Sequence, residues 1–95
     1  MADPSGVVLT VFTHPACSGC TRAVQQAWEL TELHATVSLK TVSLTAKEGL
    51  DRAQKEGVKT IPTFILSAGG RELERWVGTP RKGSLDAAVE AAVAA

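Results

Sequence analysis

Residues 7–20, VVLTVFTHPACSGC, begin with a β-branched apolar run. Three residues after this run come two cysteines, which are separated by two residues. A nearly continuous apolar run of this length is typical of a strand that is buried on both faces of a sheet. Pro15 breaks the strand, and it restricts the residue before it, His14, to an extended conformation. Over residues 17–33 the pattern becomes helical, with Cys20 and Trp28 on one apolar face. The stretch therefore predicts a strand, a short loop and a helix that begins at the first cysteine.

The segment after this helix repeats the change from strand to helix. Residues 36–44 alternate like a strand, and a change of phase in the middle indicates a bulge or a later strand start. Thr45 and Glu48 form a capping box that predicts the start of a second helix. Gly57 is placed to end that helix. A strand, a helix and a strand in this order imply a parallel pair with a right-handed crossover.

The last third of the chain predicts a hairpin and a final helix. Two short strands, residues 63–66 and 73–77, flank the turn residues 68–70. An apolar stripe of helical spacing follows Ser84, which is a good N-cap residue. The predicted architecture is therefore of the α/β class, a four-stranded mixed sheet flanked by three helices.

The composition fits one globular domain over residues 1–95. Ten Lys and Arg balance ten Asp and Glu, and this zero net charge argues against a nucleic-acid or membrane-surface partner. The sequence has no apolar run of about 18 residues, and its first residues lack the basic and apolar regions of a signal peptide. We therefore expect a cytoplasmic monomer.

The chemistry of the chain is expected at its two cysteines. They are too close in sequence to link distant segments, so their value is local redox or metal chemistry. The N-terminus of a helix offers free N–H donors and partial positive charge, which stabilise a thiolate at Cys17. Cys17 can then attack a substrate disulfide, and Cys20 can resolve the mixed disulfide that forms. The sequence thus predicts a thiol–disulfide oxidoreductase.

Two downstream motifs carry a resemblance to a known family. The residues TIPT, 60–63, lie between the second helix and a strand, and VGTP, 77–80, follow the last strand. Together with the C-x-x-C, they make nearly the whole chain resemble the thioredoxin/glutaredoxin superfamily. The resemblance implies a minimal thioredoxin fold with strand order 2-1-3-4. It also implies that Pro62 is a cis-proline facing the cysteines, that the backbone of Ile61 binds substrate, and that Gly78 opens a third loop of the site.

Thr60 and His14 complete the predicted substrate-binding residues. The ring of His14 is either a solvated loop side chain, or it lies beside Cys17 and favours the thiolate when protonated. By resemblance, the substrates are protein or small-molecule disulfides and no resident cofactor is needed. The electrons then come from a reductase or from glutathione.

The chain departs from both branches of this superfamily. Ala16 stands where thioredoxins usually carry Trp, and residues 18–19, Ser-Gly, replace their Gly-Pro. Val11 occupies the position of the buried Asp that accepts the proton of the second cysteine. Residues 78–79, Gly-Thr, do not match the Gly-Gly motif with which glutaredoxins hold glutathione.

Metal binding is the main rival to redox chemistry. Copper carriers also have a C-x-x-C between a strand and a helix, and thiolates suit Cu(I) or Zn. Their element order is βαββαβ, however, and they usually have Met where this chain has Pro15. A closed Zn site needs two more ligands, and the histidines are only His14 and His34. The pattern is also compatible with an interaction protein whose cysteines sense redox state, and with a pair of inert core thiols.

Four cations lie close to the predicted site in the sequence. They form either an ordinary solvated surface or a ring that attracts acidic substrates. These residues are Arg22, Lys59, Arg81 and Lys82.

Overall fold

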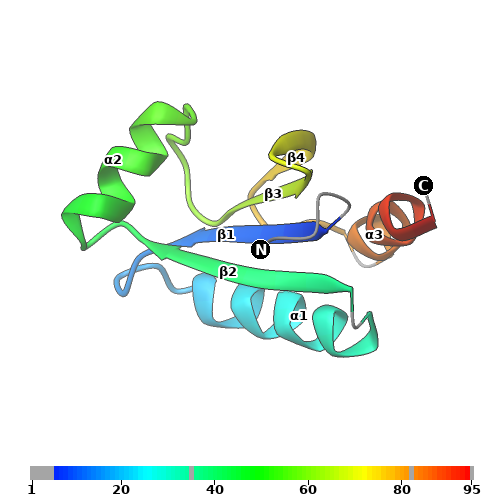
Figure 1. Ribbon diagram of the computed structural model, residues 1–95. Coiled ribbons are helices and arrows are strands. Elements are labelled where there is room, and N and C mark those ends of the chain that lie inside the picture. Colours follow the sequence, from blue (N-terminus) through cyan, green and yellow to red (C-terminus); the bar gives the residue numbers. More distant parts are fainter. Residues whose placement is uncertain (1–5, 35, 82, 95) are drawn as a thin grey trace.

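The computed structural model describes residues 6–34, 36–81 and 83–94. Figure 1 shows one sheet with helices packed on both of its faces. The elements are β1 (Val7–Thr13), α1 (Cys20–Leu33), β2 (Val37–Ser43), α2 (Lys47–Lys55), β3 (Thr63–Ala68), β4 (Arg71–Val77) and α3 (Ser84–Ala94).

The four strands form a mixed sheet in the order β2-β1-β3-β4. Strand β1 runs parallel to β2 and antiparallel to β3, and β3 and β4 form an antiparallel hairpin. Gly69 and Gly70 make the hairpin turn with φ of 60° and 80°, values that glycine adopts without steric cost. The predicted fold class, strand order and number of helices are confirmed.

Alternate residues of β1 enter two separate apolar clusters, which explains its nearly continuous apolar run. Leu9 and Val11 lie in the larger cluster, under α1 and α3. Phe12 points to the opposite face, where it packs with Ala53 of α2. All three strand residues are fully buried. The predicted strand buried on both faces is confirmed, and its C-terminal end leads directly into the cysteine loop.

The apolar pattern of β2 changes phase because its residues also face two different clusters, and no bulge interrupts its pairing with β1. β2 pairs with β1 residue by residue, from Val37 opposite Val7 to Ser43 opposite Thr13. Val37 belongs to the larger cluster and Val42 to the smaller one on the other face. The register shift lies in the hairpin instead.

The buried face of α1 differs from the predicted one. Besides Cys20, it consists of Ala23, Ala27 and Leu30, whereas Trp28 is 55% exposed. Small alanines let the helix approach the sheet closely, so the bulkiest apolar side chain is left outside. The prediction that Trp28 belongs to the core was therefore wrong.

The second helix ends as predicted but begins differently. Thr45 is not its N-cap: the helix begins at Lys47 after Ala46, and the hydroxyls of Thr45 and Ser43 are hydrogen-bonded at 2.8 Å. At the other end Gly57 has φ of 72°, and the N–H of Val58 donates to the carbonyl of Ala53 at 2.8 Å. This bond is typical of the Schellman motif, and it turns the chain toward Pro62.

The third helix begins at Ser84 itself and not after it as predicted. The hydroxyl of Ser84 accepts a hydrogen bond from Trp76 Nε1 at 3.3 Å. Trp76 is half-buried and packs against the larger cluster. This contact joins β4 to α3.

Arg75 fixes the segment that leads from α2 to Pro62. Its Nη2 donates to the backbone carbonyl of Glu56 at 2.8 Å and to the carboxylate of Glu72 at 2.8 Å. The hydrogen bond from Arg75 lowers the pKa of Glu72, and the positive charge of Arg75 adds to this effect. A side chain of β4 thus holds the C-terminal end of α2 in place.

Gly49 allows α2 to lie against the end of β2. A Cβ atom at this position would be 1.9 Å from the backbone oxygen of Ser43. Any larger residue must therefore push the helix away from the strand.

We expect Gly49→Ala to destabilise the protein, although alanine is the better helix former by about 1 kcal/mol. The expected loss in the free energy of unfolding is about 1–3 kcal/mol, the usual range for overpacking. Urea denaturation measures it, with Gly19→Ala as control, because a Cβ at Gly19 meets no atom within 4 Å. A Gly49→Ala protein more stable than the wild type would show that the close approach is absent.

No helix in the part of the chain that the structure describes combines the length and the apolar character needed to cross a membrane.

Candidate active site

Cys17 and Cys20 form a disulfide at the junction between β1 and α1. Their Cα atoms are 5.4 Å apart, within the normal range for a disulfide. The intervening turn is held by two backbone bonds, from the N–H of Cys17 to the carbonyl of His14 at 2.9 Å and from the N–H of Cys20 to the carbonyl of Cys17 at 3.3 Å. The local turn, and not contact with distant residues, thus brings the two sulfur atoms together.

The helix begins at Cys20, three residues later than predicted. Cys17 therefore lies in the turn before the helix, and Gly19 is the N-cap residue without a side-chain cap. The N–H groups of a first helical turn have no intrahelical acceptor. Cys17 still lies next to this positive end of the helix.

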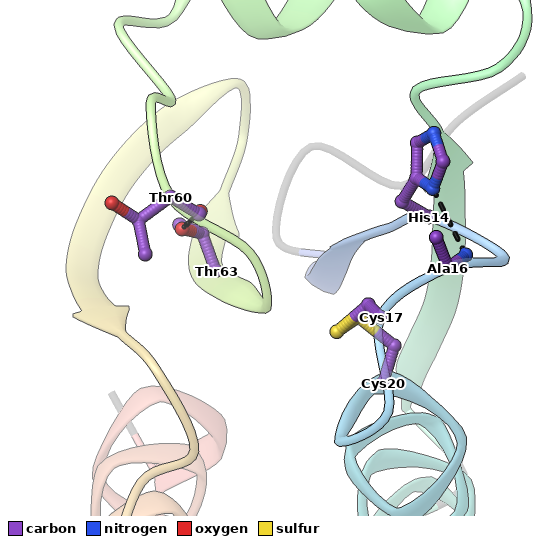
Figure 2. Close-up of a disulfide and its surroundings, with 6 residues drawn as sticks. All are labelled: His14, Ala16, Cys17, Cys20, Thr60 and Thr63. Atoms are coloured by element: carbon purple, nitrogen blue, oxygen red, sulfur yellow. Dashed lines mark hydrogen bonds between the residues drawn. A yellow bond between two sulfur atoms is a disulfide. The ribbon is translucent and has the colours of Figure 1, made fainter.

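The two cysteines differ in accessibility. Cys20 is 4% exposed on the buried face of α1, whereas Cys17 is half-buried. Figure 2 shows the disulfide on the side of its loop that faces the segment of Thr60 and Thr63. An incoming molecule can therefore reach Cys17 more readily than Cys20.

Two hydrogen-bonded loops form the opposite side of the site. The peptide bond between Ile61 and Pro62 is cis. The N–H of Gly78 donates to the carbonyl of Pro62 at 2.8 Å, and the hydroxyl of Thr63 donates to the carbonyl of Thr60. Pro62 is buried, Ile61 and Gly78 are half-buried, and Thr60 is exposed. The structure thus brings together four residues that the sequence separates into two motifs.

His14 is placed by the cysteine loop and not by the disulfide. Its Nδ1 accepts a hydrogen bond from the N–H of Ala16 at 3.0 Å. Figure 2 shows the ring directed away from the two sulfur atoms. The geometry supports a role for His14 in shaping the loop that carries Cys17.

We expect His14→Ala to lower turnover of a disulfide substrate several-fold, because the N–H of Ala16 loses its acceptor. His14→Asn should restore most of the rate, since an asparagine oxygen commonly accepts a backbone N–H two residues further on. Steady-state kinetics of the two variants at one pH provide the comparison. Equal losses in both variants would exclude this positioning role.

Val11 forms part of the apolar floor beneath α1. It is fully buried and belongs to the same cluster as Ala23 and Ala27. No carboxylate stands at this position, where thioredoxins bury one.

A hollow of about 330 Å³ lies beside the buried cysteine, and no sequence motif indicates it. It is lined by Thr13, His14, Pro15, Cys20, Thr21, Val24 and Ser43.

The metal hypothesis gains no support from the described residues. Within residues 6–34, 36–81 and 83–94, no three His, Cys, Asp or Glu side chains are grouped as metal ligands. His34, the second histidine, follows the C-terminal end of α1, at the far end of the helix from Cys20.

Comparison with known proteins agrees with this geometry. A family model described as a thioredoxin-like domain matches residues 3–92. A thioredoxin of Synechocystis is 28% identical over 83 residues, which are 87% of this chain and 77% of that protein. The structure of thioredoxin-2, described as a component of the malaria parasite's protein secretion machinery, superposes with a TM-score of 0.80. It is 26% identical, and the match covers 90% of this chain and 82% of that one.

A third structure supports the fold alone. Oxidised thioredoxin O2 of Arabidopsis thaliana superposes with a TM-score of 0.81 at 22% identity. The match covers 92% of this chain and 75% of that chain.

Proposed function

Because this chain belongs to the thioredoxin-like family and holds Cys17 and Cys20 as a disulfide, we propose that it is a thiol–disulfide oxidoreductase. The observation that carries the proposal is the unequal exposure of the pair. A half-buried Cys17 next to a helix N-terminus is suited to attack, and a 4% exposed Cys20 is suited to resolve an intermediate.

The proposed reaction starts from the dithiol form. The thiolate of Cys17 attacks one sulfur atom of a substrate disulfide, so a bond from Cys17 to that sulfur forms and the substrate S–S bond breaks. The other substrate sulfur leaves as a thiolate and takes a proton from solvent. The thiol of Cys20 then loses its proton and attacks Cys17, which releases the second substrate thiolate. The substrate has gained two electrons and the protein is left with the Cys17–Cys20 disulfide.

The docking surface for the substrate is proposed opposite Cys17. Among the described residues, no backbone hydrogen bond outside the helices and strands involves Ile61, so its backbone can pair with an extended substrate segment. Pro62 and Gly78 form the wall beside it. The bond from Gly78 to the carbonyl of Pro62 supports this assignment, because it holds the two loops at a fixed separation. Thr60 is exposed at the rim of this surface.

The cycle requires an external donor that reduces the Cys17–Cys20 disulfide. We propose a protein reductase, as for a thioredoxin, in preference to glutathione. The reason is that residues 78–79 lack the paired glycines and the acidic residue that resemblance to a glutaredoxin would require.

The test is catalytic turnover of a protein disulfide by a small amount of this protein, with dithiothreitol as the electron source. We expect many substrate disulfides to be reduced per protein molecule, and none above background with Cys17→Ser/Cys20→Ser. Copper and zinc are measured on the same reduced samples. Absence of turnover together with one bound metal ion per chain would establish a metal carrier instead.

A further inference from the structure

The three segments that border the disulfide carry cations and no carboxylate. They are residues 14–22, 58–62 and 78–81. Each contains one Arg or Lys, and these three side chains, Arg22, Lys59 and Arg81, are exposed. Lys82, the fourth cation near the site in the sequence, lies outside the described residues. Because the whole chain has no net charge, this positive character is a local separation of charge and not a general property of the surface.

Contacts between the segments bring the parts of the chain that carry the three cations next to one another. The N–H of Gly78 bonds to the carbonyl of Pro62 at 2.8 Å, so the segments of Arg81 and Lys59 adjoin. Arg22 and Pro80 line the same hollow, so the first turn of α1 adjoins the segment of Arg81. Figure 2 shows the cysteine loop facing the segment of Thr60.

The three cations are free to act on an incoming molecule. In the described part of the chain, the ion pairs are Arg52–Glu56 and Arg75–Glu72, and neither involves these side chains. Two carboxylates, Asp86 and Glu29, line the same hollow as Arg22 and offset part of its field.

We infer that the preferred substrates are polypeptide disulfides flanked by Asp or Glu, an inference that rests on the proposed function. Each exposed charge contributes little to static binding. Their summed field acts on the encounter, where steering raises association rates by about 10- to 1,000-fold at low salt. The preference therefore belongs to kcat/KM and to its salt dependence more than to kcat.

The test uses three peptides with the same disulfide and flanking Glu, Gln or Lys residues. At low ionic strength we expect kcat/KM to be at least about tenfold higher for the Glu than for the Lys peptide. The variant R22E/K59E/R81E should reverse this order. The control K40E/K47E/R71E changes the net charge equally at exposed residues of β2, α2 and β4, and it should keep the wild-type order.

A salt titration of the wild type provides a second readout that does not depend on folding of the variants. The kcat/KM for the Glu peptide should fall toward the kcat/KM for the Gln peptide as ionic strength rises. Equal kcat/KM for all three peptides would overturn the charge preference while the proposed function stands. Oxidised glutathione reduced faster than the Glu peptide would overturn the assignment to polypeptides. Reduction of none of these disulfides would overturn the proposed function itself.

Discussion

Cys17→Ser is expected to lower turnover of a protein disulfide to the uncatalysed rate, and Cys20→Ser to stop the reaction one step later. Without the Cys17 thiolate no mixed disulfide can form, because Cys20, the first residue of α1, is only 4% exposed. Without Cys20 the first attack still occurs. The mixed disulfide then persists because no second thiol is positioned to break it.

The two variants are distinguished by what they trap. Each reduced protein is incubated with a disulfide peptide, quenched with acid and analysed by mass spectrometry without reductant. We expect a covalent adduct on Cys20→Ser, linked through Cys17, and none on Cys17→Ser. An adduct on the Cys17→Ser protein, carried by Cys20, would reverse the roles assigned to the two cysteines.

Val11→Asp is expected to be the most destabilising of the substitutions considered. Val11 is fully buried in the apolar cluster beneath α1, and an unpaired buried carboxylate costs several kcal/mol. That is a large part of the roughly 5–15 kcal/mol that stabilises a typical domain. Burial would raise the pKa of the introduced carboxyl above its unfolded value of about 3.9. The penalty from the charge is then absent below the unfolded value and grows as pH rises from it toward the raised value, so it is larger at pH 7 than at pH 5.

Urea denaturation at pH 7 and pH 5 measures both the size and the sign of this effect. Val8→Asp is the matched control, since Val8 is on the same strand but only half-buried. We expect the control to lose much less stability than Val11→Asp at pH 7. A Val11→Asp protein within about 1 kcal/mol of the wild type at pH 7 would mean that a group in the floor of the site neutralises the charge.

Much of the fold could be predicted because its signals are local. The apolar run of β1, the paired glycines of the hairpin and Gly57 at the end of α2 each determine their own segment. The phase of α1 could not be predicted, because apolar size favours Trp28 whereas close packing against the sheet favours Ala23. The start of α2 was misjudged because the Thr45 hydroxyl pairs with Ser43.

The candidate site shows the same division between local and distant signals. The cysteine pair is visible in the sequence because four consecutive residues contain it. The bond from Gly78 to Pro62 and the bond from Arg75 to Glu56 join segments that are far apart in the chain. The spacing of apolar residues along the sequence does not indicate such contacts. The placement of His14 depended on a single hydrogen bond to Ala16, which only coordinates can show.

The central claim is that the Cys17–Cys20 dithiol reduces the substrate disulfide, and mapping the cysteines after one round of reaction tests it most directly. Fully reduced protein is mixed with an equal amount of a disulfide peptide, quenched, alkylated and digested. We predict that dithiol peptide and the intramolecular Cys17–Cys20 disulfide form in equal amounts. Reduced peptide alongside Cys17 and Cys20 that are both alkylated, and therefore still thiols, would contradict the account.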